Sequence, residues 1–235
     1  MVRVQYPGIE QMAFAVVNDK TVNNVQMKSV VPKLIPPTAS EDAYLQVVMV
    51  GDKEYAGALV HTPLPVPVLQ GVPLPYLGLD LQFRIPAASM KVIRCFEIDV
   101  KTGIFAPTNP PTPNVQDGST QIEIFNGGQI QIDGAYPKAT WANVPNAKTG
   151  ALPADTWIPW SGRFFIDYAN KKHSVLSLEV NNQEHLIPAS MQGLPMLPTN
   201  WSTKVQIQHQ LDITAPGTVE VHYKLETATW SDAIF

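Results

Sequence analysis

The run YLGLDLQFRI, residues 76–85, alternates apolar residues with small or polar ones at every position. A period of two is typical of a strand that buries one face. The same alternation recurs at 219–226, where Glu220, His222, Lys224 and Glu226 form the polar side. His222 is therefore expected to be a solvated strand residue rather than a ligand.

Further short apolar runs continue this pattern, and we expect about ten to twelve strands in all. The other candidates are 13–17, 44–50, 55–60, 92–100, 122–124, 130–132, 164–166, 176–180 and 205–211. Asn126-Gly127-Gly128 and Asn181-Asn182-Gln183 are hairpin signals. Many short strands without helical periodicity predict an all-β, two-sheet antiparallel β-sandwich of jelly-roll type, with residues 1–235 as one domain.

Three stretches interrupt the strands. Residues 61–75 carry five prolines and predict an extended connector or sheet edge. Residues 102–118 and 134–162 are expected to be long loops, and the second holds Tyr136, Trp141, Trp157 and Trp160. Loops of such length in a compact domain are often functional.

Composition narrows the function classes. The net charge of −4 with scattered Lys and Arg gives no basic stripe for nucleic acid. Cys95 is the one cysteine, so no intramolecular disulfide forms, and it is expected to be a buried small residue. No run of about 18 apolar residues and no signal-peptide pattern occurs, so no membrane partner is expected and the compartment stays open.

The segment 95–101 places Glu97, Asp99 and Lys101 on one face of a strand, opposite Phe96 and Ile98. Two carboxylates and an amine at alternate positions make a polar stripe on a sheet. This stripe is the candidate site for chemistry. The alternative interpretation is an ion-paired, solvated sheet face.

The segments LDLQFRIP (79–86) and FEID (96–99) resemble the concanavalin A-like lectin/glucanase superfamily. The resemblance extends over roughly 44–230 and implies a curved jelly roll that holds sugars on its concave face. It also favours a secreted or cell-surface location. In its laminarinase-like hydrolases the strand reads Glu-x-Asp-x-Glu, so the resemblance implies Glu97 as nucleophile and Asp99 as assisting acid. Lys101 stands where the acid/base glutamate is expected, and Glu123 is a substitute from a later strand.

The legume-lectin-like interpretation of the same residues implies that the carboxylates of the stripe ligate calcium. That family's loop ligands are missing here, although Asn109, Asn114 and Asp117 lie a little farther on. No metal site or cofactor is therefore expected, with calcium as the alternative. Residues 206–209, QIQH, are similar to the Gln-Ile-His strand of jelly-roll alginate lyases, with one residue more before the histidine. That family's arginine and tyrosine motifs are absent.

The aromatic residues of the second long loop are candidate sugar-stacking platforms. We expect Trp141, Trp157, Trp160 and Tyr136 to line a groove beside Glu97 and Asp99, whereas Trp201 and Trp230 are expected in the core or at an edge. The resulting hypothesis is a carbohydrate-associated domain that binds a poly- or oligosaccharide. Its alternatives are a retaining glycoside hydrolase with Glu97 as nucleophile, and a non-catalytic structural or assembly jelly roll. The oligomeric state is left open.

Overall fold

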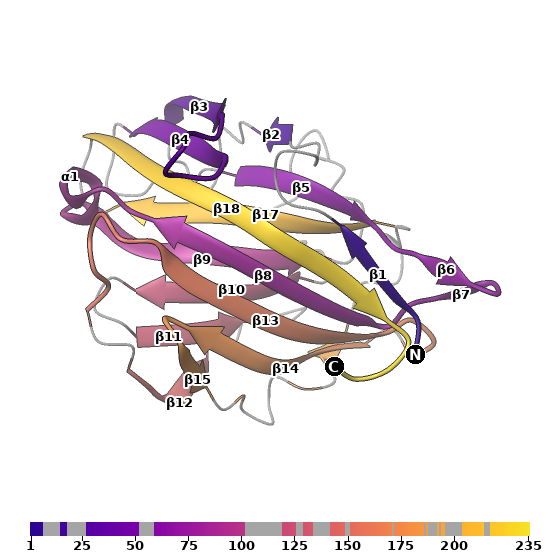
Figure 1. Cartoon of the computed structure of the whole chain (residues 1–235). Coiled ribbons are helices and arrows are strands. Elements are labelled where there is room, and N and C mark those ends of the chain that lie inside the picture. Colours follow the sequence, from indigo (N-terminus) through magenta and orange to yellow (C-terminus); the bar gives the residue numbers. More distant parts are fainter. Residues whose placement is uncertain are drawn as a thin grey trace.

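The computed structural model describes most of the chain, in segments separated by gaps (Figure 1). The described residues are 1–6, 15–17, 27–51, 59–101, 119–125, 129–133, 142–148, 151–170, 172–185, 187, 192, 194–195, 204–213 and 217–235. In parts of these segments, including 94–101, the backbone alone is described.

The described strands form two large antiparallel sheets and one small one. The first sheet has the order β15 (Gln183–His185), β14 (Lys172–Val180), β13 (Ile158–Asp167), β8 (Tyr76–Arg84), β18 (Gly217–Ser231), β4 (Tyr44–Gly51) and β3 (Met27–Ile35), with β1 (Arg3–Tyr6) on β18 and β16 (Leu194–Pro195) on β14. The second has the order β12 (Ala142–Lys148), β11 (Gln129–Asp133), β10 (Ser119–Phe125), β9 (Ile93–Lys101), β17 (Lys204–Ile213), β5 (Leu59–Pro65) and β2 (Ala15–Val17). The small sheet pairs β6 (Val68–Leu69) with β7 (Val72–Pro73).

Strand β8 lies at the centre of the first sheet and has the predicted alternation. Leu79, Leu81 and Phe83 are buried, while Asp80 and Gln82 on the other face are half-buried. The buried face packs into one core cluster that also contains residues of β10 and β11 in the second sheet. The predicted all-β sandwich is therefore confirmed, and in Figure 1 the first sheet lies in front of the second.

The short helix α1 (Ala87–Met90) follows β8 and leads the chain across to β9 in the second sheet. The hairpin predicted at 181–183 is also confirmed, since β14 and β15 pair around it. Asn181 and Asn182 both have positive φ, at 54° and 60°, as a tight hairpin turn requires. Strands β10 and β11 pair as the signal at 126–128 predicts, although that turn itself lies outside the described residues.

Other expectations need correction. The described residues form 18 strands, more than the ten to twelve expected, because several are only two or three residues long. The segment 134–162 is not one loop, since it contains β12 and the start of β13. Pro159 and Gly162 concealed the first part of β13, whose later part was predicted at 164–166, and its residues alternate strictly between buried and half-buried.

The segment 61–75 likewise begins inside a sheet, because β5 lies between β17 and β2. The described pairing of β5 with β2 covers Leu59 to His61, and Pro63 and Pro65 lie beyond this part of the pairing. The predicted loop at 102–118 lies outside the described residues. Within the described part of the chain, no helix has the length and apolar character needed to cross a membrane.

Candidate functional site

Strand β9 brings the predicted polar stripe into the middle of the second sheet, between β10 and β17. Antiparallel pairing places each of its three polar positions level with one residue on either side. The rows are Gln210–Glu97–Glu123, Gln208–Asp99–Gln121 and Gln206–Lys101–Ser119. We call these nine positions the polar ladder.

The polar ladder occupies the outward face of the second sheet. Directly paired residues of neighbouring strands lie on the same face, with Cβ atoms about 4.5–5.5 Å apart. Ile122 and Ile124, which alternate with Gln121 and Glu123 along β10, are fully buried in the core. The ladder positions therefore belong to the opposite face, and this assignment rests on backbone pairing.

The chemistry of the ladder follows from its residue types. Glutamine offers two N–H donors and a carbonyl acceptor, and an ionised carboxylate accepts from two oxygens. Rows of amides beside carboxylates can therefore both donate to and accept from hydroxyl groups. The row containing Glu97 and Glu123 also puts two carboxyl groups on adjacent strands.

Trp157 lies on the other sheet. Its indole Nε1 donates to Glu41 Oε1 over 2.8 Å. Two cations of this chain lie over its ring, the Arg84 guanidinium at 4.4 Å and the Lys224 ammonium at 4.3 Å from the ring centroid. The ring is thus engaged in cation–π contacts within the protein.

Arg84 contacts several other side chains around Trp157. It donates from Nε to His222 Nδ1 over 3.0 Å and from a terminal nitrogen to Glu41 Oε1 over 2.7 Å. It also lies 5.2 Å from the ring centroid of Tyr44. We call the seven residues Glu41, Tyr44, Arg84, Trp157, Glu220, His222 and Lys224 the Arg84 cluster.

His222 is buried within this cluster, at 7% exposure, so the expectation of a solvated residue was wrong. Its ring contacts those of Tyr44 and Trp157, which cover the polar side of β18 at this point. Since Nδ1 accepts from Arg84, the hydrogen of the neutral imidazole is on Nε2, which donates to Glu220.

Both carboxylates of the Arg84 cluster are held in the ionised form. The hydrogen bond from Trp157, together with the charge of Arg84, lowers the pKa of Glu41 below its usual value. Burial opposes ionisation of Glu220, but the hydrogen bonds from Gln46 and His222 outweigh it and lower the pKa of Glu220. The negative charges of Glu41 and Glu220 are thus balanced by neighbouring side chains of the same protein. The contacts of the cluster hold residues 41–44 and Trp157 against the first sheet.

The remaining predicted aromatic residues are dispersed. Trp160 is on β13 and is 1% exposed, so its ring belongs to the core and offers no surface for stacking. Trp230 is fully buried, as predicted. Trp141, Tyr136 and Trp201 lie outside the described residues.

The structure therefore separates two parts of the predicted groove. Trp157 lies with Arg84 and Lys224 on the outward side of the first sheet. Glu97 and Asp99 belong to the outward side of the second sheet, across the core. Because the core lies between them, Trp157 and the polar stripe cannot both contact the same sugar residue of a ligand.

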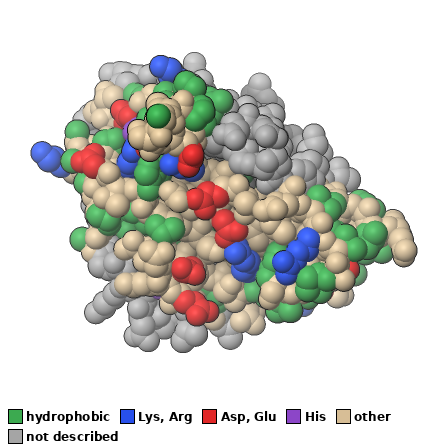
Figure 2. Space-filling view, viewed as in Figure 1, with side chains coloured by type: hydrophobic (Ala, Val, Ile, Leu, Met, Phe, Trp, Pro, Cys, Tyr) green, Lys and Arg blue, Asp and Glu red, His purple; other side chains and the backbone are tan. Residues whose placement is uncertain are grey.

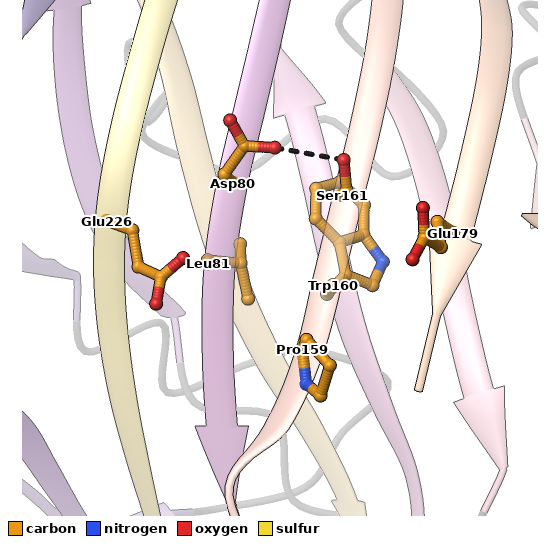
Figure 3. A pocket seen from close by; sticks show the side chains of 7 residues that line it. All are labelled: Asp80, Leu81, Pro159, Trp160, Ser161, Glu179 and Glu226. Atoms are coloured by element: carbon orange, nitrogen blue, oxygen red, sulfur yellow. Dashed lines mark hydrogen bonds between the residues drawn. The ribbon is translucent and has the colours of Figure 1, made fainter. Parts of the chain in front are cut away.

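A shallow depression of about 240 Å³ also lies on the outward face of the first sheet (Figure 3). The residues around it are Asp80, Leu81, Pro159, Trp160, Ser161, Glu179 and Glu226, of which Leu81 and Trp160 are each only 1% exposed. Figure 2 shows acidic side chains following one another across this face, with basic side chains beside them.

Asp80 in the depression is fully engaged. One carboxylate oxygen accepts from Ser161 Oγ at 2.9 Å and from Arg163 at 2.8 Å, and the other accepts from Thr227 at 2.9 Å. Among the residues whose side chains are described, no three His, Cys, Asp or Glu are grouped to hold a metal ion. The hydrogen bonds of Asp80 join β8, β13 and β18 on the outward face of the first sheet.

Sequence reasoning named Glu123 as a candidate without placing it beside Glu97, and it missed the other partners of both groups. The pairing of Glu97 with Glu123 and Gln210 depends on strand order, which local alternation does not reveal. The alternating glutamines at 206, 208 and 210 were a signal for a polar face on β17. Glu41 and Arg84 gave no signal, because the chain separates them by 43 positions.

No family model and no curated protein matches this chain. Its fold is nevertheless defined, since two stacked antiparallel sheets with a shared core form an all-β sandwich.

Among solved structures, the chain is similar to an endo-β-1,4-glucuronan lyase from the fungus Trichoderma reesei, at 11% identity and a TM-score of 0.50, over 97% of this chain and 94% of that one. An alginate lyase from a Chlorella virus is 9% identical with a TM-score of 0.49, over 88% and 93% of the two chains. The lectin UEA-II in complex with galactose is 10% identical with a TM-score of 0.46, over 99% of both. At such identities the likeness concerns the fold.

Proposed function

We propose that this protein is a carbohydrate-binding domain that holds a poly- or oligosaccharide on the polar ladder. The observation that carries the proposal is the strand register, which aligns Glu97 and Asp99 with amides of β10 and β17 in successive rows. Sugar hydroxyls are donors and acceptors at once, and mixed rows of amides and carboxylates match both roles.

The fold supports the same conclusion. The lyase with which the chain shares its fold acts, by its name, on a glucuronan. Trp157 and Trp160 have no part in the proposed surface, because one belongs to the Arg84 cluster and the other to the core. Trp141 and Tyr136, which lie outside the described residues, remain proposed sugar-stacking residues.

The test is binding to a panel of polysaccharides and oligosaccharides, on a glycan array and by isothermal titration, with and without calcium. Glu97→Gln and Gln208→Ala alter the ladder, and Glu226→Gln is the matched control on the first sheet. We expect the ladder variants to weaken binding at least about tenfold, or about 1.4 kcal/mol, and the control to bind as the wild type does. No binding across the panel, or equal loss in the control, would refute the proposal.

A second function is favoured by one specific pairing, that of Glu97 with Glu123. Retaining glycosidases need two carboxyl groups about 5–5.5 Å apart, and direct pairing places Glu97 and Glu123 on the same face of adjacent strands. In this scheme Glu97 attacks the anomeric carbon while Glu123 protonates the leaving oxygen. Glu123 then takes a proton from water, which hydrolyses the glycosyl ester and frees Glu97.

Release of reducing sugar separates hydrolysis from binding. If the domain is a hydrolase, Glu97→Gln and Glu123→Gln each abolish release, and Asp99→Asn lowers it. A wild-type protein that binds a glycan without releasing sugar from it excludes the hydrolase and leaves the binding function intact.

A further inference from the structure

The hairpin formed by β6 and β7 belongs to neither large sheet. Its two strands pair only with each other among the described strands, through Val68 with Pro73 and Leu69 with Val72. It projects from one end of the sandwich (Figure 1). A two-stranded ribbon of this kind is only marginally stable in water on its own.

The base of the hairpin is nevertheless firmly held. Val66 and Leu74, on either side of it, are 7% and 3% exposed and belong to the core cluster. The Leu74 amide donates to the Pro67 carbonyl over 2.9 Å. Pro67 and Pro73 also fix their φ angles, which makes the projecting ribbon stiff.

The tip of the hairpin is apolar and open. Val68, Leu69 and Val72 are 55%, 40% and 65% exposed. The tip turns at Gln70 and Gly71, whose φ angles of 50° and 82° are both positive. The sequence has no Lys, Arg, Asp or Glu between residues 55 and 79. Exposed strands are usually protected from pairing by charged side chains, and this ribbon has none.

We propose that the β6–β7 hairpin is a self-association surface that docks against the same hairpin of a second copy of this chain. An uncharged apolar ribbon meets its own copy without electrostatic repulsion, as a two-fold symmetric contact requires. Two ribbons together pass the size at which a β-structure becomes stable in water.

Charge argues against a lipid surface as the occupant. The chain has a net charge of −4, and the stretch from 55 to 79 has no Lys or Arg to anchor it to anionic headgroups. The hairpin tip is small beside a standard protein interface, and contacts below about 1,200 Å² are typical of transient complexes. The dimer is therefore reversible and dependent on concentration.

Sedimentation velocity of the full chain across a wide concentration range tests the proposal. We expect the wild type to shift from monomer to dimer, and Leu69→Asp to lower the association constant at least about tenfold. Leu34→Asp is the matched control, because Leu34 is 38% exposed, close to the 40% of Leu69, but lies on β3. A wild type that stays monomeric, or equal losses in both variants, would overturn the proposal.

Cross-linking tests the same contact without a charged substitution. In a Cys95→Ser background, Val68→Cys is expected to form an intermolecular disulfide under mild oxidation, whereas Glu184→Cys on β15 is not. If neither or both cross-link, the hairpin contact is rejected. Pelleting with phosphatidylcholine–phosphatidylglycerol vesicles covers the rival occupant. Vesicle binding that Leu69→Asp removes, in a protein that remains monomeric, assigns the hairpin to lipid instead.

Discussion

The imidazole of His222 links a cation and an anion on the polar side of the first sheet, since its two nitrogens bond to Arg84 and Glu220. Removal of the His222 ring leaves the partly buried Arg84 and Glu220 side chains without this hydrogen-bond partner. We expect His222→Ala to lower the free energy of unfolding by about 1–3 kcal/mol. Urea denaturation measures this, with the exposed Glu184→Gln as a control expected to change little. Similar values for both variants would show that the contacts of His222 do not stabilise the fold.

Trp157 has a pH-dependent role through Glu41. The Trp157 hydrogen bond lowers the pKa of Glu41 from its usual value of 4.5. A carboxyl group whose folded-state pKa is depressed stabilises the fold above its unfolded-state pKa, and this contribution is lost as the pH falls through the folded-state pKa. Trp157→Phe removes the donor, so we expect the variant to be less stable than the wild type at neutral pH.

The same linkage predicts that the difference shrinks in acid, as Glu41 becomes protonated in both proteins. Urea midpoints at about pH 7 and about pH 3 measure the two gaps. If the difference in urea midpoint between the two proteins is the same at both pH values, the substitution acts through packing of the ring and not through Glu41.

At the scale of the element, β13 shows how aromatic residues and glycine share one face of a strand. Trp160 and Phe164 stack with their ring centroids 6.4 Å apart, and Gly162 lies between them on the strand. A Cβ atom at Gly162 would lie 2.5 Å from the Trp160 ring and 2.8 Å from the Phe164 ring. The absence of a side chain at Gly162 is what admits the two rings.

We therefore expect Gly162→Ala to cost about 1–3 kcal/mol through overpacking. Gly78→Ala on β8 is the matched comparison. Its nearest contact, Phe235 at 3.1 Å, belongs to a ring that is 39% exposed and can move aside. Thermal unfolding should show the larger loss for Gly162→Ala, and equal losses would contradict this account of β13.

The elements that were predictable from sequence are those whose alternation is local. The strands predicted at 76–85 and 219–226 correspond to β8 and to part of β18. The turn predicted at Asn181–Asn182 joins two paired strands. Of strand β13 only 164–166 was predicted, because Pro159 and Gly162 interrupt the pattern of its first part, although Pro159 pairs with Gln82 in the sheet. Its identity as a strand is set by the neighbours on either side, and a single segment of sequence does not contain them.

The candidate site was predictable only in part for a related reason. Alternation along β9 correctly grouped Glu97 and Asp99 on one face, but strand order supplied Glu123 and the glutamines of β17. The loop tryptophans were assigned by residue type alone. Whether an aromatic ring faces solvent, the core or a cation depends on contacts distant in sequence, as Trp157 with Glu41 shows.

For the whole molecule, the surface features described above point in three directions. The polar ladder belongs to the outward face of the second sheet, and the Arg84 cluster and acidic depression belong to the outward face of the first. The β6–β7 hairpin projects from one end (Figure 1). A contact between two hairpins therefore leaves the polar ladder of each copy uncovered.

A dimer joined at its ends would present two ladders to one polysaccharide, and a second binding event within one complex raises avidity without any new contact. If both proposals hold, Leu69→Asp should lower retention on an insoluble polysaccharide by more than about tenfold while its affinity for a short oligosaccharide stays unchanged. Glu97→Gln should lower both. Depletion assays and calorimetry give the two quantities, with Leu34→Asp as the control. Undiminished retention of Leu69→Asp would show that each ladder acts alone.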